Sequence, residues 1–299
     1  MNWAKDATER GLGGYHPLVS FGYYVVIIGL TLLFIHPVFA LLSLVCAIIH
    51  AVQLSSKKGW RVILLVGLPL FLIASLANPF FNHHGSTYLF YFYYNPITLE
   101  AVVFGIVSAT MMFGMIMWFF CYSEVVTSDK FLYIFGRMIP TVALIASMTL
   151  RLIPRLMHQA RVISNVQRGM GISLFHGSVL SRVKGGARIV SVLVSWALED
   201  AVLTADSMRS RGYGSFKRSS FSIYRFYRRD AVVLGAILSL AIFGVAAYLL
   251  GFGQLLYFPA VHSPRLDGAA LLFYFLFLLL ALLPILLTLR EDIRWESSM

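Results

Sequence analysis

The sequence predicts an all-α integral membrane protein with about six transmembrane helices and a cytoplasmic domain of long amphipathic helices. Two observations predict this fold class. Of the 299 residues, 59% are hydrophobic and only 12% are charged, a composition far too apolar for a soluble domain of this size. The apolar residues also gather in runs that are long enough to cross a bilayer. We therefore expect the lipid bilayer to surround much of the chain.

The net charge and the cysteines exclude other classes of partner. The net charge is +11 at pH 7, but the cations lie between and beside the apolar runs, where membrane topology explains them. We therefore expect no nucleic-acid partner. Cys46 and Cys121 lie in apolar runs and share no metal-ligand spacing, so neither a disulfide framework nor a metal site is indicated.

The first region, residues 1–122, contains four expected transmembrane helices. The expected spans are residues 19–35, 38–54, 62–77 and 96–120. His36-Pro37 ends the first helix and begins the second, because proline is tolerated only at the start of a helix. Asn78-Pro79 is expected to stop the third span for the same reason. Residues 78–95 contain many aromatic side chains and no Lys or Arg, which suits a loop in the outer interfacial belt.

Residues 131–150 are apolar enough to span but contain Arg137 and Pro140. If this segment crossed the membrane, the 14 cations of residues 151–229 would face outward, against the positive-inside rule. If it does not cross, both termini are cytoplasmic and 23 of the 24 cations lie inside, with only Arg265 outside. We therefore expect this segment to lie against the membrane or other helices, and a re-entrant hairpin stays open as an alternative.

Residues 123–229 are expected to form the cytoplasmic domain, built on two amphipathic helices. The first is expected to begin at Pro154, after the segment 131–150, which itself follows a capping cluster at residues 127–129. The second is expected over residues 186–210, and it carries a stripe of mostly small residues. The stripe consists of Ala187, Val190, Val194, Ala197, Ala201, Ala205 and Met208. Small side chains permit a close crossing, so we expect the two helices to pack as an X or a V.

The last region, residues 230–299, holds the remaining two spans at 231–250 and 268–289, with Asp230 as the cap of the first. Across all six spans, His50 and Glu100 fall near predicted ends, and Asp, Lys and Arg are absent from the interiors. Pumps and ion-coupled transporters place ionisable groups at membrane depth. The chain also contains no phosphate-binding loop and no zinc-protease motif. We therefore expect neither catalytic residues nor a cofactor.

The second long helix closes with an arginine- and glycine-rich stretch, Ser207-Met-Arg-Ser-Arg-Gly-Tyr-Gly214. Its local features fit a charged helix C-cap, because glycine adopts the left-handed conformation and cations favour the last carbonyls. The stretch also resembles the second arginine motif of the transmembrane T component of energy-coupling factor transporters. Further matches are Asn78-Pro-Phe-Phe-Asn82, Thr127-Ser-Asp-Lys130, Ser147-Met-Thr-Leu-Arg-Leu-Ile-Pro-Arg155 and Val166-Gln-Arg-Gly-Met-Gly171.

The resemblance implies a subunit of the cell membrane that couples ATP hydrolysis on other chains to import of vitamins or transition-metal ions. In that family, two long cytoplasmic helices each dock an arginine motif into one of two ATPase subunits, while the spans hold a substrate-binding S component. The implied docking residues of the second motif are Arg209, Ser210, Arg211 and Gly212.

The first motif departs from the usual form. Aligned on Val166-Gln167, the arginine position holds Met170; aligned on the charge, it is Arg168. The resemblance therefore implies docking through Gln167, Arg168, Gly169 and Met170. We favour Arg168 as the charged docking residue.

A membrane-embedded enzyme with a cytoplasmic active site is the alternative function. Glu199, Asp200 and Asp206 would then act on a charged substrate. Carboxylates on a long helix beside many arginines more commonly form structural ion pairs. A channel is a third hypothesis, but the spans show no polar pore lining.

Overall fold

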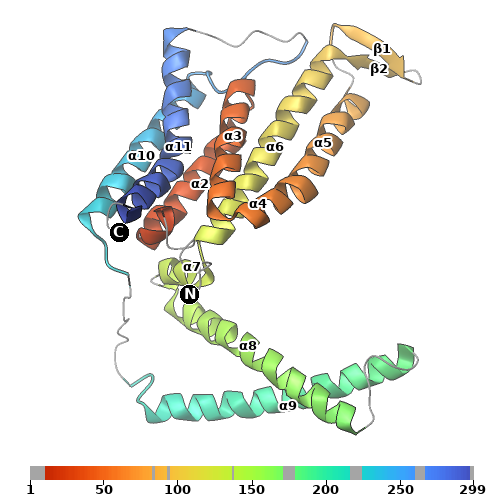
Figure 1. Ribbon diagram of the computed structural model, residues 1–299, viewed down its shortest axis with the longest axis vertical. Coiled ribbons are helices and arrows are strands. Elements are labelled where there is room, and N and C mark those ends of the chain that lie inside the picture. The colour runs from red at the N-terminus through yellow and green to blue at the C-terminus, as the bar shows by residue number, and fades with distance from the viewer. Residues whose placement is uncertain are drawn as a thin grey trace. The chain divides into compact units, whose positions relative to one another are not determined.

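The chain forms two units that consist almost entirely of helices (Figure 1). The computed structural model describes residues 11–82, 85–92, 95–136, 138–170, 179–215, 224–259 and 267–296. One unit joins Met1–Phe131 to Tyr224–Met299, and the other is Leu132–Ile223. With 84% of the chain in helices, the expected all-α integral membrane protein is confirmed.

The larger unit contains the apolar helices. They are α2 (Pro17–Leu33), α3 (Pro37–Leu54), α4 (Ser56–Val62), α5 (Leu68–Phe81), α6 (Leu99–Val125), α10 (Arg228–Leu249) and α11 (Gly268–Glu296). Among the described residues, five segments are long and apolar enough to cross a membrane, namely Pro37–Leu54, Lys57–Phe81, Leu99–Val125, Arg228–Leu249 and Gly268–Glu291. The helix Pro17–Leu33 is a shorter apolar helix, which at about 1.5 Å per residue is close to the thickness of the hydrocarbon core.

The starts of these helices follow from their sequences. Pro17 and Pro37 occupy the first turn of α2 and α3, where a missing N–H leaves no hydrogen bond unmade. The division at His36-Pro37 is thus confirmed. Asp230 was expected directly before a helix that starts at residue 231, but α10 starts at Arg228 and Asp230 is its third residue. Its Oδ2 accepts from the backbone N–H of Tyr227 at 2.8 Å, so it caps the helix from within the first turn.

The expected stop at Asn78-Pro79 was wrong. Pro79 lies inside α5, which continues to Phe81, and the N–H of Asn82 still donates to the carbonyl of Asn78 at 2.8 Å. Pro79 has no N–H to donate to the carbonyl of Ser75, so one bond of the preceding turn is missing while the helix continues. Proline here precedes the stop by two residues.

The aromatic stretch after α5 forms a hairpin and not simply a loop. Strand β1 (Tyr88–Phe92) pairs antiparallel with β2 (Asn95–Thr98), at the end of α6 that lies opposite α7 (Ser128–Gly136) in Figure 1. Aromatic and β-branched residues favour the extended conformation. The fourth apolar helix consequently begins at Leu99 and not at residue 96.

Glu100 fastens this hairpin to the start of α6. Its buried carboxylate accepts from the backbone N–H and the hydroxyl of Ser86 at 3.3 and 3.1 Å, and from the N–H of Thr87 at 3.1 Å. A carboxylate in the first turn also interacts favourably with the helix dipole. The one acidic side chain near this span end is therefore a structural anchor.

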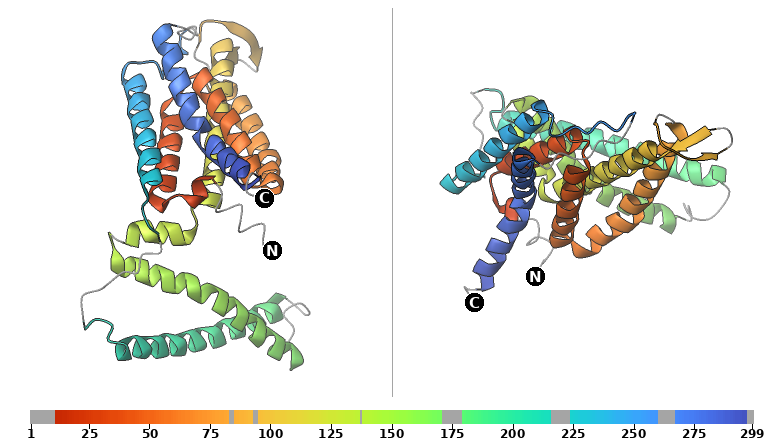
Figure 2. Two further views of the ribbon diagram at one scale, coloured as in Figure 1. Left: turned by 60° about the vertical axis from the view of Figure 1, so that its left-hand side comes forward. Right: turned by 90° about the horizontal axis from the view of Figure 1, so that it is seen from above.

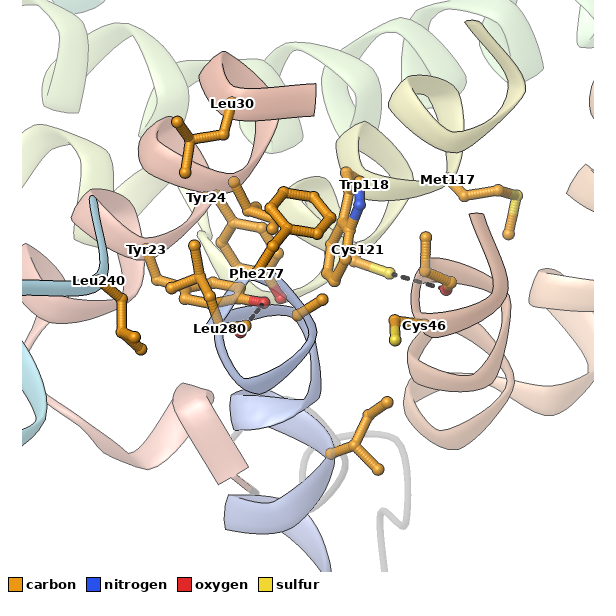
Figure 3. Packing of buried hydrophobic residues seen from close by; sticks show 14 of the residues in the cluster. Tyr23, Tyr24, Leu30, Cys46, Met117, Trp118, Cys121, Leu240, Phe277 and Leu280 are labelled. Carbon is orange, nitrogen blue, oxygen red and sulfur yellow. Dashed lines mark hydrogen bonds between the residues drawn. The ribbon is translucent and has the colours of Figure 1, made fainter. Parts of the chain in front are cut away.

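Aromatic side chains from α2, α6 and α11 form the centre of the larger unit (Figure 3). The ring centroid of Trp118 lies 6.0 Å from Tyr23 and 6.5 Å from Tyr24, each edge to face. Phe277 and Leu280 of α11 pack into the same cluster. Edge-to-face pairs of this kind add about 0.5–1.5 kcal/mol to the burial of their area.

Several polar side chains of this core are paired between helices, although Nδ1 of His50 has no hydrogen-bond partner among the described residues. The Tyr24 hydroxyl lies 3.0 Å from Nε2 of His50, and Trp118 Nε1 donates to the hydroxyl of Ser43 at 2.9 Å. The Tyr23 hydroxyl donates to the carbonyl of Leu280 at 3.2 Å. Each bond joins two different helices. The hydrocarbon of a bilayer could not take the place of either partner, because it forms no hydrogen bonds.

Glycines bring the third apolar segment close to its neighbours. Between α4 and α5, residues Ile63–Gly67 form a π-helical turn, and a Cβ at Gly67 would overlap the ring of Phe113 on α6. A Cβ at Gly105 of α6 would lie 2.9 Å from the carbonyl oxygen of Ser75 on α5. Small residues of this kind allow apolar helices to approach each other closely in a membrane.

The smaller unit contains two long helices, α8 (Pro140–Gly169) and α9 (Val179–Ser210). The apolar segment 131–150 is therefore divided between the end of α7 and the start of α8. The start at Pro154 was wrong, because Pro140 takes the first helical turn and Pro154 lies inside α8. Helix α9 likewise starts seven residues earlier than expected, since Gly185 and Gly186 continue the helix at a cost of about 1 kcal/mol each.

Replacement of Gly67 by alanine tests the glycine contact. The added methyl group would force Phe113 to move, so we expect Gly67→Ala to destabilise the protein by about 1–3 kcal/mol. Gly29→Ala is the matched control, because a Cβ there would meet open space and alanine favours the helix. Thermal unfolding of the two purified variants in detergent is the measurement. Equal melting temperatures would contradict the contact.

Candidate docking site at the ends of α8 and α9

The two long helices cross each other (Figure 2). They are joined by a charged and aromatic cluster. Nη1 of Arg155 on α8 lies 3.0 Å from Oδ2 of Asp200 on α9. The same guanidinium lies 5.8 Å from the ring centroid of Trp196. Because the arginine side chain is 55% exposed, the ion pair is worth at most about 1 kcal/mol. The expected packing of two long helices against each other is confirmed.

The face that α9 turns toward α8 is not the small-residue stripe. Ile189 is buried, and Leu193, Trp196 and Asp200 are half-buried, whereas Val190 and Val194 on the stripe are more than half exposed. The expectation that the stripe packs within the chain was wrong. The Arg155 contacts select a face rotated from the stripe, and within the described chain most of the stripe stays uncovered.

The end of α8 places the four residues of the first motif in different surroundings. The side chain of Gln167 is 4% exposed, whereas Met170 is 63% exposed and Arg168 and Gly169 are exposed as well. Within the described residues, Oε1 of Gln167 has no hydrogen-bond partner. The N–H of Met170 donates to the carbonyls of Val166 and Gln167, each at 3.1 Å. The charge and the thioether of the motif thus point to the surface, and the amide does not.

The end of α9 is a complete glycine C-cap. The N–H of Tyr213 donates to the carbonyl of Met208 and the N–H of Gly212 to that of Arg209, each at 3.0 Å. These two bonds define the Schellman motif, in which the residue after the cap is left-handed. Gly212 has φ +80°, which glycine adopts without strain. Arg211 is therefore the cap residue, and the chain turns away directly after it.

The side chains at this tip are accessible. Arg209, Ser210 and Arg211 are all exposed, and Ser210 Oγ donates back to the carbonyl of Ser207 at 2.9 Å. Together the two motifs carry three guanidinium groups and no carboxylate. Arginine forms bidentate hydrogen bonds with carboxylates, so both tips are suited to an acidic groove on another molecule.

The carboxylates of the enzyme hypothesis do not form a common cluster around a substrate site. Asp200 is engaged by Arg155, and Glu199 and Asp206 are exposed on α9. In the part of the chain that the structure describes, no three His, Cys, Asp or Glu side chains are placed to hold a metal ion. The ion pair at Asp200 agrees with the expectation that carboxylates on this helix form structural ion pairs.

Two sets of residues were missed by sequence reasoning. One is the interhelical polar network of the core. In the sequence, Ser43 stands among apolar residues, and only its position on the helix could have indicated a hydrogen-bond partner on another helix. The other is the turn Gly11–Gly14, which Lys130 and Arg229 contact. Neither cation was expected to contact this segment, and the signal that could have found the turn is its three glycines.

Comparisons with known proteins point to one family. No protein-family model matches the chain. The energy-coupling factor transporter transmembrane proteins EcfT of Lacticaseibacillus paracasei and Lactobacillus helveticus are each 33% identical to it, over 99 and 106 residues. These alignments cover 33% and 35% of this chain and span 38% of the length of each relative.

A third relative extends the similarity to most of the chain. The protein of the same description from Staphylococcus aureus is 24% identical over 252 residues, which covers 77% of this chain and 94% of the relative. The similarity to membrane proteins of this description agrees with several helices long and apolar enough to cross a bilayer. The relatives therefore confirm the resemblance of this chain to the transmembrane T component of energy-coupling factor transporters.

Proposed function

We propose that this chain is the scaffold and energy-coupling subunit of an ATP-driven importer of vitamins or transition-metal ions. It links two ATPase subunits, which hydrolyse ATP, to a membrane S component that binds the substrate. The observation that carries the proposal is the end of α9, where exposed arginines stand on a helix closed by a glycine cap. Such an end presents charge at a defined position, because the cap fixes the last turn of the helix.

The two docking motifs have different chemistry in this proposal. The tip of α9 docks through Arg211, flanked by Ser210 and Gly212, with Arg209 at the edge of the contact. The tip of α8 docks through Arg168, with Gly169 and Met170 beside it. Gln167 supports this tip from its buried position. Two unlike tips suit two ATPase subunits that are not identical.

The uncovered stripe of α9 further supports assembly with other chains. Its exposed apolar members, among them Val190 and Val194, need cover that the described part of this chain does not provide. Apolar patches of this kind mark interaction surfaces. The S component is the partner that we propose for the membrane unit, with residues 123–229 as the cytoplasmic coupling domain, flanked by membrane regions 1–122 and 230–299.

Charge reversal at Arg211 tests the docking. Two carboxylates would then face each other in a partly desolvated groove, and loss of one buried charge partner costs about 2–5 kcal/mol. We expect Arg211→Glu to lower copurification of one ATPase subunit by tens-fold and to reduce transport, without loss of the folded membrane protein. The measurement is the ATPase retained on the affinity-purified chain.

Matched variants distinguish docking from simple helix capping. Arg209→Glu should have a smaller effect, and Arg168→Glu should release the other ATPase subunit. If capping is the whole role of the arginines, Arg211→Glu and Arg209→Glu will shift the melting temperature equally and both will retain the ATPases. That result would contradict the docking proposal.

The proposed topology has both termini and the coupling domain in the cytoplasm and the β1–β2 hairpin outside. Leu89 on β1 and Ser195 on α9 are exposed positions for single cysteines, and Cys46 and Cys121 are buried and give little background. In sealed cells, a membrane-impermeant maleimide should label Leu89→Cys but not Ser195→Cys. Labelling of Ser195→Cys from outside would contradict the proposed topology.

A further inference from the structure

The turn Gly11–Gly14 binds side chains from four different helices. The N–H of Gly11 donates to Oε2 of Glu291 on α11 at 2.6 Å, and the hydroxyl of Ser20 on α2 donates to the carbonyl of Leu12 at 2.6 Å. Nζ of Lys130 on α7 donates to the carbonyl of Gly13 at 2.8 Å. Nη2 of Arg229 on α10 donates to the carbonyl of Gly14 at 3.1 Å.

Glycines make this arrangement possible. Gly11 has φ +58°, and a Cβ there would overlap Thr288 of α11. Because Gly11, Gly13 and Gly14 have no side chains, the peptide groups of the turn are open to approach from several directions. The turn is buried at its first three residues, so the four contacts are its means of satisfying backbone polar groups.

The two cations hold the chain immediately before and after the smaller unit. Lys130 precedes Leu132, where that unit begins, and Arg229 follows Ile223, where it ends. Their partners, the carbonyls of Gly13 and Gly14, are adjacent in the sequence. The two cations and the two glycines all belong to the larger unit.

The contact at Lys130 is specific. The residue is only 7% exposed, and its ammonium also donates to the carbonyl of Val125 in the last turn of α6 at 3.1 Å. A lysine is buried only when its charge is stabilised, and carbonyls at a helix C-terminus provide the favourable end of the dipole. Lys130 thereby joins α6 and α7 to the turn.

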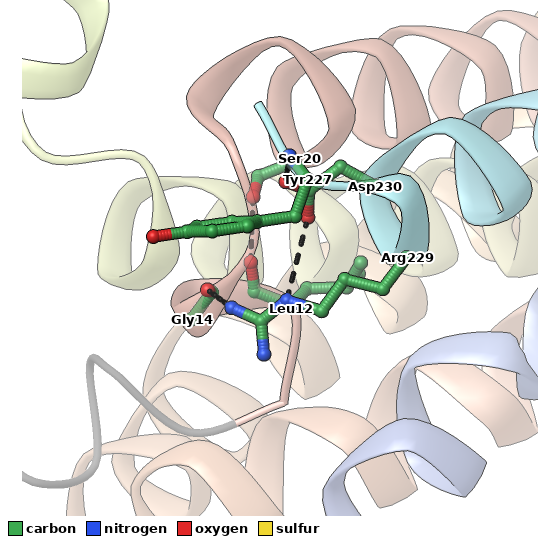
Figure 4. A network of polar contacts seen from close by, with 6 residues as sticks. All are labelled: Leu12, Gly14, Ser20, Tyr227, Arg229 and Asp230. Atoms are coloured by element: carbon green, nitrogen blue, oxygen red, sulfur yellow. Dashed lines mark hydrogen bonds and ion pairs between the residues drawn. The ribbon is translucent and has the colours of Figure 1, made fainter. Parts of the chain in front are cut away.

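The contact at Arg229 is reinforced by aromatic rings and a carboxylate (Figure 4). Its guanidinium lies 5.2 Å from the ring centroid of Tyr15 and 5.6 Å from that of Tyr227, and Nε is 3.8 Å from Oδ1 of Asp230. Next to it, the ring of Phe226 meets His16 edge to face at 5.2 Å. Burial and the charge of Glu291 raise the pKa of the Tyr15 hydroxyl.

We propose that Lys130 and Arg229 are positioning residues that transmit motion through the Gly11–Gly14 turn from the coupling domain to α2, α10 and α11. This inference rests on the proposed function as an energy-coupling subunit. A displacement of either connection pulls on adjacent peptide groups of one turn, so the helices bound to that turn move together. Coupling of this kind requires a contiguous network of contacts, and the four bonds supply one.

Hydrogen exchange tests the proposal on the complex of this chain with its copurified ATPase subunits. Magnesium ATP is the probe, and exchange is compared with and without it. In the unaltered chain, we expect a nucleotide-dependent change both at the end of α9 and in α2 and α10. In Lys130→Met and Arg229→Gln, the change in α2 and α10 should fall by about threefold or more, while the change at the end of α9 persists.

Lys58→Met is the matched control. It removes an exposed ion pair with Glu124 at 2.9 Å that does not involve the turn, and it should behave like the unaltered chain. Lys130→Arg keeps the charge and should retain part of the response. Because Arg229 is largely exposed, Arg229→Gln gives a folded variant even if Lys130→Met does not accumulate.

The outcomes separate the two proposals. An unchanged nucleotide response of α2 and α10 in Arg229→Gln would overturn the positioning role alone. A loss of the response at the end of α9 together with lower melting temperature would show that the turn only maintains the fold, and would also overturn it. If the unaltered chain retains no ATPase, the proposed function fails, and this inference fails with it.

Discussion

The structure depends on the need to satisfy polar groups where hydrocarbon offers no hydrogen bonds. Each unpaired backbone or side-chain group at membrane depth costs several kcal/mol. The helices satisfy their own backbones, so the remaining problem is the side chains. Tyr24 with His50, and Trp118 with Ser43, solve it by bonding to each other across helices, and the helices are thereby held in one arrangement.

The same constraint determines what happens where the helices end. At one end of α6, Glu100 accepts from the loop before β1, and at the other Lys130 donates to the carbonyl of Val125. A negative group at the N-terminal end and a positive group at the C-terminal end both complement the helix dipole. The positive-inside rule uses charged residues only to assign topology. Here such residues also form hydrogen bonds that stabilise the helix ends.

The sequence was sufficient for the fold class, for the two long helices and for the resemblance, because apolar runs and helix caps are local signals. His36-Pro37 and the capping role of Asp230 were interpreted correctly for that reason. Pro79 and Pro154 were not, since a proline can be tolerated inside a helix when tertiary contacts or a nearby end compensate. The face of α9 that meets α8 also escaped prediction, because it is selected by Arg155, which belongs to another helix. Of the candidate site, the sequence placed Arg211 at a helix end but could not show that Gln167 is buried.

The Arg155–Asp200 pair has a mechanical consequence for the helix that follows it. Beyond Asp200, residues 201–207 of α9 are exposed, so within the described residues these turns of the helix project beyond the ion pair. Arg211 lies eleven positions after Asp200 in the sequence. At about 1.5 Å per residue along the helix axis, this places it roughly 16 Å from the ion pair. A tilt of about 10° at the pair would sweep the arginine through roughly 3 Å, the width of a hydrogen bond. Small angular changes at a weak, solvated ion pair are thus amplified into displacements large enough to make or break a contact at the tip.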